Sequence, residues 1–200
     1  MSGVLEPGFY AVPPGCVATV VTHLEMRAPV AARPERDSGL RLRRVERPDA
    51  DWYLRLFRKV GAEQWMWFSR LVMAEEMLLA VLHDPKVEVY VAEGAAGEAG
   101  LLELDFRAGG ACELAFFGLA PEAIGQGAGR WLMNRALELA WREGVGRVHL
   151  HTCTLDSPQA MDFYRRSGFA AVRREVEVLR DPRLSGHLPE DAAPGVPILR

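Results

Sequence analysis

The chain has 200 residues, of which 49% are hydrophobic and 26% are charged, and its formal net charge is -3. This composition is typical of a globular protein with a full core, and the slightly acidic balance excludes the basic surface of a nucleic-acid-binding protein. No apolar run reaches the length of a membrane span and no secretory signal begins the chain, so we expect a cytoplasmic protein with no membrane partner. Three scattered cysteines and five histidines lack metal-ligand spacing, so we expect reduced thiols and no metal.

Composition predicts three parts: an arm with a linker over residues 1–39, a domain over 40–180 and a proline-rich extended tail over 181–200. Residues 16–26 of the arm are apolar and rich in β-branched side chains, which predicts a strand that packs on the domain or on a partner subunit. Because an extended apolar strand tends to pair, this arm could support a homodimer. Residues 28–39 have the composition of a linker.

The domain is predicted to begin with a strand over 40–45 and to continue with helices, the first capped by Asp49 or Asp51 and the second running from Glu63 to Leu82. Three antiparallel strands should follow, over 87–92, 100–106 and from Cys112 onward. The remaining pattern is helix, strand, helix and strand. We therefore expect an α/β fold of the α+β type, with a mixed, mostly antiparallel central sheet flanked by helices.

A glycine loop, Ile124-Gly125-Gln126-Gly127-Ala128-Gly129-Arg130, opens the helix that follows the third of these strands. The first amides of a helix lack partners inside the helix, and the helix dipole makes that end attractive to anions. This predicts a pyrophosphate cradle without a required basic side chain. A tight strand-to-helix turn with no ligand is the alternative. The spacing fits neither a P-loop nor a dinucleotide fingerprint.

A second motif, from Ser157 to Phe169, reads as a short helix with Ser157 as N-cap and Pro158 at the first helical position. Tyr164 lies one turn before the helix stops at Gly168. A phenol keeps its proton at neutral pH, so Tyr164 could donate it to a leaving group. The alternative is a core aromatic side chain on an amphipathic helix.

Both motifs, in this order and spacing, resemble those of the GNAT superfamily of acyl-CoA-dependent N-acetyltransferases. Leu119-Ala120-Pro121 is similar to the family's strand exit before its loop, and the later motif is similar to its Asn-x-x-Ala…Tyr…Gly-Phe signature. Two positions depart from the family: Ile124 replaces Arg or Gln, and Ser157 replaces Asn. The resemblance implies a GNAT-like fold with acetyl-CoA as cosubstrate. It also implies direct transfer of the acetyl group to a primary amine of a small molecule or peptide.

The resemblance assigns the cofactor to two stretches of backbone and one side chain. The amide of Leu119, or of a neighbour in Phe117 to Leu119, is the expected oxyanion donor, and the loop amides hold the pyrophosphate. The cofactor-binding residues are therefore expected to be Phe117, Gly118, Leu119, Gln126, Gly127, Ala128, Gly129, Arg130 and Ser157.

Three catalytic residues are expected. An amine with a pKa of about 10 must lose a proton before it attacks a thioester, so a base is needed. Glu113, at the start of the strand that leads into the loop, is the first candidate, and His151 is the second. The resemblance assigns Tyr164 the role of proton donor to the thiolate. A solvated Glu113 and a structural histidine stay open as alternatives, whereas Cys153 lacks a base and is interpreted as structural.

Three aromatic residues, Trp65, Trp67 and Phe68, fall where the family's early helices shape the acceptor pocket. They could form a lid or a cage over the amine, with ordinary core packing as the alternative. Nothing in the sequence identifies the acceptor. A non-catalytic acyl-CoA-binding sensor or partner-binding module is the alternative function.

Overall fold

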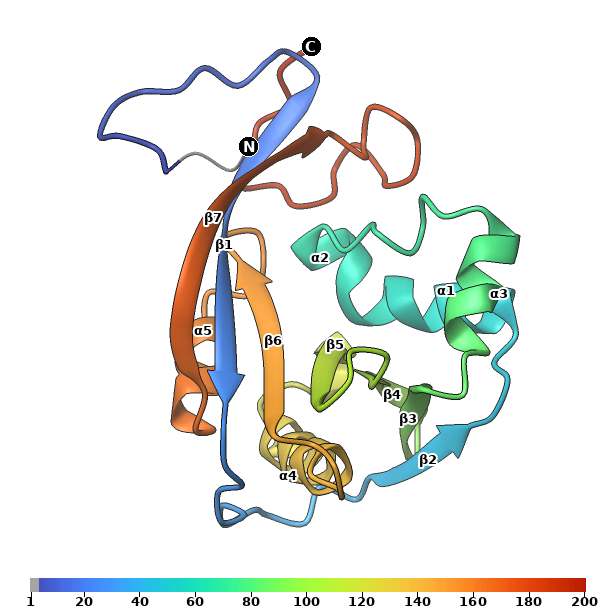
Figure 1. Cartoon of the computed structure of the whole chain (residues 1–200). Helices are drawn as coiled ribbons and strands as arrows, with labels where there is room; N and C mark the ends of the chain where they lie inside the picture. The colour runs from blue at the N-terminus through green and yellow to red at the C-terminus, as the bar shows by residue number, and fades with distance from the viewer. Residues whose placement is uncertain (1–3) are drawn as a thin grey trace.

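The computed structural model describes residues 4–200, so the first three residues of the predicted arm lie outside the described part. One sheet contains all seven strands in the order β2-β3-β4-β5-β6-β1-β7 (Figure 1). Every neighbouring pair is antiparallel except β5 and β6, which are parallel. This confirms the predicted mixed, mostly antiparallel sheet. The strands are β1 (Cys16–Met26), β2 (Arg41–Val45), β3 (Val87–Gly94), β4 (Gly97–Asp105), β5 (Ala111–Leu119), β6 (Arg147–Cys153) and β7 (Ala170–Arg180).

Helices cover both faces of the sheet, as the sequence predicts (Figure 1). On one face lie α1 (Ala50–Phe57), a π-helical turn (Arg58–Ala62), α2 (Glu63–Trp65) and α3 (Glu75–Leu82). On the other face lie α4 (Ala128–Ala140) and α5 (Ala160–Arg166). The Asp49 side chain caps α1 by accepting from the Trp52 amide at 3.0 Å, as expected. Among residues 4–200, no helix is long and apolar enough to cross a membrane.

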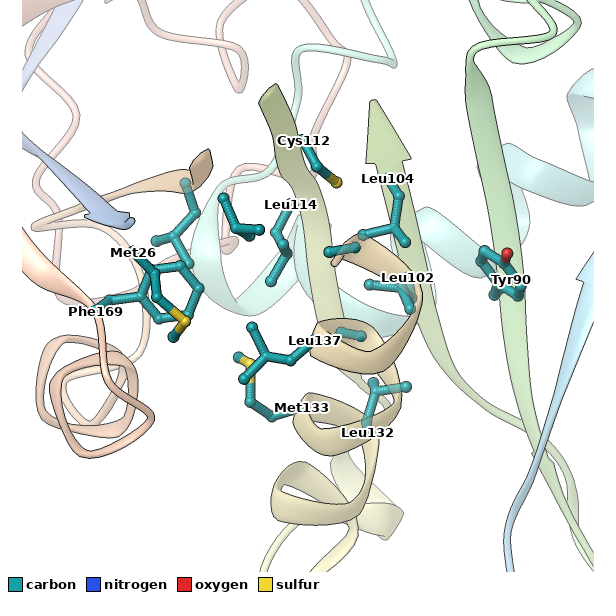
Figure 2. Close-up of a cluster of buried hydrophobic side chains, with 14 of the residues drawn as sticks. Met26, Tyr90, Leu102, Leu104, Cys112, Leu114, Leu132, Met133, Leu137 and Phe169 are labelled. Atoms are coloured by element: carbon teal, nitrogen blue, oxygen red, sulfur yellow. The ribbon is translucent and has the colours of Figure 1, made fainter. Parts of the chain in front are cut away.

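The core has two parts because successive side chains of a strand point to opposite faces. Figure 2 shows the part under α4, where Leu132, Met133 and Leu137 pack toward the side chains of Leu102 and Leu104. The other part lies between the sheet and α1 to α3. This packing fixes the start of α4, and with it the glycine loop, against the end of β5.

The helix predicted from Glu63 to Leu82 is wrong in its middle. The chain leaves the helical path at Met66, which has a left-handed φ of 51°, and helix resumes only at Glu75. The Trp67 ring folds back onto Gly61, where a Cβ atom would lie 2.3 Å from the ring. The same ring packs against Phe57 and Phe116. This aromatic packing outweighs the local helical propensity of the segment.

The N-terminal strand β1 lies inside the sheet rather than on its edge. It pairs with β6 on one side and with β7 on the other, so both of its edges are occupied by its own chain (Figure 1). The predicted strand is confirmed with its bounds, and it packs on the domain. The linker after it is fixed as well: the buried Asn134 side chain of α4 accepts from the Arg33 amide at 3.3 Å and donates to the Arg33 carbonyl at 2.8 Å.

The tail over 181–200 consists of turns instead of the predicted extended arm. Leu188, Ala192 and Ala193 are buried against the cluster under α1, and the Ala193 amide donates to the Glu63 carbonyl at 2.9 Å. Arg183 is buried in an ion pair with Asp181 at 2.7 Å. The apolar residues between the prolines carry this packing, which the proline content alone did not predict.

The two parallel strands separate soon after they meet. Pairing between β5 and β6 covers only Ala111, Cys112 and Glu113, which lie opposite residues 147–149. A bulge in β5 follows at once, because Glu103 pairs with Phe116 whereas Leu104 pairs with Leu114. Beyond Glu113 the edge of β5 that faces β6 is therefore unpaired, and the side chains of both strands open into the space between them.

Candidate active site

A cavity of about 660 Å³ lies between the diverging ends of β5 and β6. It extends from the glycine loop and α5 on one side of the sheet to the loop after α2 on the other. Most of the residues that the sequence selects line it together: Trp65, Trp67, Phe68, Glu113, Phe117, Gly118, Leu119, Gly129, His151, Ser157 and Tyr164. Four of the selected residues do not line the cavity. They belong to the glycine loop and the first turn of α4: Gln126, Gly127, Ala128 and Arg130.

The glycine loop has the backbone of an anion cradle. Gly125 and Gly127 have φ angles of +89° and +86°, a region that favours glycine. The helix α4 then begins at Ala128. Arg130 is not available as an amide donor, because its N–H already donates to the Gly127 carbonyl at 3.1 Å. Within residues 4–200, the amides of residues 126–129 have no hydrogen-bond partner, so these four remain free for an anion.

Four arginines surround the loop, and the sequence pointed only to Arg130. Arg33 donates through Nη1 to the Arg166 carbonyl at 2.6 Å, and Arg130 donates through Nη1 to the Ser167 hydroxyl at 3.1 Å. Arg36 lies beside Gly127: a Cβ atom placed on Gly127 would be 3.7 Å from the Cβ atom of Arg36. Burial lowers the pKa of Arg130, and the charges of Arg33 and Arg166 lower it further.

None of these four guanidinium groups forms an ion pair with a carboxylate of the described chain. Their mutual repulsion leaves a site whose charge an anion would neutralise. Arg33 and Arg36 lie in the segment predicted as a linker, and contacts of this segment with Asn134 and Arg135 of α4 hold it beside the loop. No sequence signal marks these contacts.

The two candidate bases form a pair. His151 Nδ1 lies 3.5 Å from Glu113 Oε1. The hydrogen bond from His151 lowers the pKa of Glu113, and the same bond raises the pKa of His151. When Nδ1–H donates to the carboxylate, Nε2 carries the lone pair that can accept a proton. His149 lies two residues earlier on β6. Burial lowers the pKa of His149, and its Nε2 has no hydrogen-bond partner among the described residues.

Tyr164 lies on α5 with its ring against Phe117, Phe163 and Phe169. Among the hydrogen bonds of the described chain, its hydroxyl has no partner, although the ring lines the cavity. Burial raises the pKa of Tyr164, and the charge of Asp156 raises it further. The phenol is therefore protonated at neutral pH and has a proton to donate.

The start of α5 differs from the prediction. The helix begins at Ala160, with Gln159 at the N-cap, so Ser157 and Pro158 precede it in a turn. The Ala160 amide donates to the Ser157 carbonyl at 2.9 Å, and the Ser157 hydroxyl accepts weakly from Gln159 at 3.4 Å. Ser157 therefore caps a turn instead of the helix, and it lines the cavity.

Trp67 forms a wall of the cavity on the side of α1 to α3. Its Nε1 donates to Asp156 Oδ1 at 2.9 Å, and its ring would lie 2.8 Å from a Cβ at Gly118. Trp67 therefore spans from β5 to the loop after β6. Burial raises the pKa of the nearby Cys153 thiol, which agrees with the structural interpretation of that cysteine. No group of three or more His, Cys, Asp or Glu within residues 4–200 could hold a metal ion.

Comparison with known proteins finds the same architecture. A mycothiol acetyltransferase from Jonesia denitrificans is 35% identical over 77 residues, which cover 38% of this chain and 24% of that protein. A GCN5-related N-acetyltransferase from Sphaerobacter thermophilus superposes with a TM-score of 0.59 at 19% identity, over 85% of this chain and 54% of that one. An aminoglycoside acetyltransferase from an uncultured soil metagenomic sample, in complex with trehalose, gives 0.53 at 19% identity, over 66% and 89%.

The chain spans about a quarter of the curated relative's length, and the structural likenesses show the fold. The sequence profile of the Acetyltransferase (GNAT) family extends further and matches residues 45–169, more than half of the chain. These residues include both motifs, the separated parallel strands and the cavity between them, and on this match the chain belongs to the GNAT family of acetyltransferases.

Proposed function

We propose that this acyltransferase moves an acetyl group from acetyl-CoA directly to a primary amine of a small molecule or a peptide. The observation that carries the proposal is the single cavity between β5 and β6. The loop with the free amides adjoins it at Gly125 and Gly129, and Tyr164, His151 and Glu113 line it. A cofactor and an acceptor that enter from opposite faces of the sheet would meet there.

Acetyl-CoA would be held by backbone and charge. The amides of residues 126–129 would receive the pyrophosphate, with Arg33, Arg36, Arg130 and Arg166 neutralising the phosphates around them. Phe117, Gly118 and Leu119 pair with β4 on one edge, while their other edge is unpaired. That free edge would bind the pantetheine arm, and the amide of Leu119 or a neighbour would stabilise the oxyanion.

Tyr164 and the His151–Glu113 pair would supply the proton transfers. His151 Nε2, oriented by Glu113, would take a proton from the ammonium form of the acceptor. The free amine would then attack the thioester carbonyl, forming the C–N bond and releasing the thiolate as the C–S bond breaks. The thiolate would take the proton of Tyr164, which would recover one from solvent.

A cytoplasmic location and a homodimer also belong to the proposal. Because β1 is paired on both edges, the arm itself offers no edge to a partner. The outer edge of β7 does, since almost the whole strand is exposed, including Val172, Val176 and Val178. A light-scattering mass of one subunit at working concentration would rule out the dimer.

Calorimetry with acetyl-CoA tests the cofactor, with Gly127→Asp and Tyr164→Phe as the two comparison variants. We expect micromolar binding that is lost in Gly127→Asp and kept in Tyr164→Phe. Thiol release with a panel of amines then tests the transfer. Absence of binding to both acetyl-CoA and CoA would overturn the proposal. Binding of acetyl-CoA without transfer to any amine would instead favour a non-catalytic binding module.

A further inference from the structure

The acceptor end of the cavity contains an arginine whose hydrogen-bonding capacity is mostly unused. Arg70 lies in the irregular segment after α2, and its side chain lines the cavity with only 13% of its surface exposed. Nη2 donates to Glu103 Oε1, Nη1 reaches only the Met73 sulfur at 3.7 Å, and Nε is buried without a partner among the described residues. A guanidinium group has five N–H donors, so most of these lack a strong acceptor.

The surroundings hold Arg70 in place. The guanidinium carbon lies 5.1 Å from the centre of the Phe116 ring. Its partner Glu103 is fully buried and also accepts from the Tyr53 hydroxyl at 2.5 Å. A charged group that is positioned by a buried carboxylate and an aromatic face is already organised for a ligand, since little side-chain freedom remains to be lost on binding.

Arg107, the other arginine on this side of the cavity, is different. Its Nε and Nη2 atoms both donate to Asp105, at 2.9 Å and 2.6 Å, in a two-pronged ion pair. The hydrogen bond to Asp105 raises the pKa of Arg107. Both guanidinium groups therefore have a carboxylate partner, but Arg107 uses Nε and Nη2 for it whereas Arg70 uses Nη2 alone.

The opposite side of the same space is negative. Glu113 lies there with His151, and Glu177 of β7 lines the cavity without an ion-pair partner in the described chain. Arg70 lies over the ring of Phe116, and Glu113, the partner of the proposed proton acceptor His151, lies three residues earlier on β5. At about 3.3 Å per residue, the positions of Glu113 and Phe116 are roughly 10 Å apart along the strand.

We propose that Arg70 binds a carboxylate of the acceptor, so that the acceptor is an amino carboxylate whose amine and carboxylate are separated by several bonds. The amine then points to His151 and Glu113 while the carboxylate takes the free N–H groups of Arg70. This inference rests on the proposed acetyl transfer, and it narrows the acceptor class. The carboxylates of Glu113 and Glu177 would attract the ammonium form of the amine, and Arg70 would bind the carboxylate of the same molecule.

Paired acceptors test this inference directly. Thiol release is measured with glycine, β-alanine, 4-aminobutyrate and 6-aminohexanoate, each beside its own carboxamide, which keeps the amine and removes the negative charge. We expect kcat/KM to favour the carboxylate of the longer members by about tenfold or more, because charge-assisted hydrogen bonds are worth that factor. We expect no such preference for glycine, which is too short to reach both ends.

Two variants identify the residue responsible. Arg70→Met alone would leave Glu103 buried without its counter-charge, so the test uses Arg70→Met with Glu103→Gln, which removes both charges and keeps an acceptor for Tyr53. The single variant Arg70→Lys is the control, because it keeps the positive charge and leaves Glu103 with a counter-charge. The preference should vanish in the double variant through KM and persist in the control. Unchanged acetyl-CoA affinity shows that both variants are folded.

The outcomes separate this inference from the proposed function. Equal kcat/KM for carboxylates and carboxamides in the unaltered protein would overturn the inference and leave acetyl transfer intact. A preference that survives in the double variant would also overturn the assignment to Arg70. Acetyl-CoA binding without turnover of any pair would reject the acceptor class alone, whereas absence of acetyl-CoA binding would remove the proposed function and this inference with it.

Discussion

The imidazole of His151 faces the carboxylate of Glu113 across the point where two parallel strands part, with 3.5 Å between Nδ1 and Oε1. The register of the last paired residues sets this relationship, because Glu113 lies opposite His149 and His151 follows on the same face of β6. The two side chains that the sequence offered as competing bases therefore act on each other. Any test of one has to include the other.

The pH dependence of the rate should reflect this pair. Because the hydrogen bond to Glu113 raises the pKa of His151, more than half of the imidazole is protonated at pH 6.5, the ordinary pKa of histidine. Only the neutral form can accept a proton, so kcat/KM should rise with pH through a midpoint above that value. In Glu113→Gln the midpoint should move to lower pH while the plateau falls, because the carboxylate no longer orients the ring.

His151→Gln should remove this titration and lower the plateau by about 10²-fold. A profile of kcat/KM against pH for the three proteins, with acetyl-CoA saturating, makes the comparison. A titration that stays unchanged in His151→Gln would assign the base to another group. The stability of the fold should change with pH in the opposite direction to the rate. The raised pKa of His151 stabilises the folded protein below about pH 6.5, and this stabilisation is lost as pH rises through the folded-state pKa.

Tyr164→Phe should separate chemistry from binding. The ring contacts with Phe117, Phe163 and Phe169 survive the change, and the described chain offers the hydroxyl no hydrogen bond to lose. We expect kcat to fall by about 10²-fold, with the acetyl-CoA dissociation constant and the melting temperature almost unchanged. Single-turnover thiol release gives kcat and calorimetry gives the affinity. A variant that lost affinity instead would make Tyr164 a packing residue of the cofactor site.

Local patterns predicted the elements well and the contacts between distant segments poorly. Strand β1 matches its predicted bounds because turn-forming and proline residues bracket a run of β-branched side chains. Its place between β6 and β7 depends on pairing with residues more than 120 positions away, for which one sequence carries no signal. The break at Met66 was missed for the same reason, since the ring of Trp67 packs on residues outside its own segment.

The same difference between local patterns and distant contacts applies to the candidate site. Glu113, His151 and Tyr164 could be selected because their residue types and their neighbours along the chain suggest chemistry. Arg70 and Arg33 could not, because each looks like an ordinary surface arginine in the sequence. The irregular segment after α2 brings Arg70 to the cavity, and the contact of Arg33 with Asn134 brings Arg33 to the glycine loop. Motifs that work through the backbone can be found in a sequence, whereas charges that arrive from remote loops need the fold.

Gly127→Asp should abolish acetyl-CoA binding without unfolding the protein. Gly127 occupies the N-cap of α4, where an aspartate can accept from the free amides and would occupy the place of an anionic ligand. Gly144→Asp is the matched control, since Gly144 has a similar φ of +84° and open space around its Cβ position. We expect at least about a tenfold loss of affinity for the first variant and none for the second.

Calorimetry at one salt concentration, with melting curves of both proteins, makes this comparison. Because both glycines have left-handed backbones, the backbone of each aspartate should cost a similar amount of stability, about 1–2 kcal/mol. Equal affinities for acetyl-CoA in the two variants would show that the glycine loop is only a turn.

The arginine cluster should make acetyl-CoA binding sensitive to salt. Arg33→Met and Arg36→Met each remove a charge beside the loop, and neither arginine has a carboxylate partner in the described chain. We expect each change to raise the dissociation constant by about three- to tenfold at low salt and by less at high salt, where exposed charges are screened. Arg27→Met is the control, because Arg27 pairs with Glu25 at 2.7 Å. A salt-independent effect would point to lost packing instead.

Asp156→Asn should loosen the wall of the cavity at Trp67. All of the partners of this carboxylate are donors: Trp67 Nε1 at 2.9 Å, the Thr152 hydroxyl at 2.5 Å and the Cys153 amide at 3.0 Å. An asparagine has one oxygen and one NH₂ group, so it would turn a donor toward at least one donor. We expect a loss of about 1–3 kcal/mol of stability, which is a fall of roughly 2–12 °C in melting temperature.

The same change should free the Trp67 ring, because its bond to the loop after β6 is broken or weakened. Quenching of tryptophan fluorescence by acrylamide should increase in Asp156→Asn and stay constant in Asp191→Asn, an exposed aspartate of the tail. If Trp67 closes the acceptor side, KM for the amine should rise while the acetyl-CoA affinity holds. A variant with normal KM and increased quenching would show that Trp67 packs the core without contacting the acceptor.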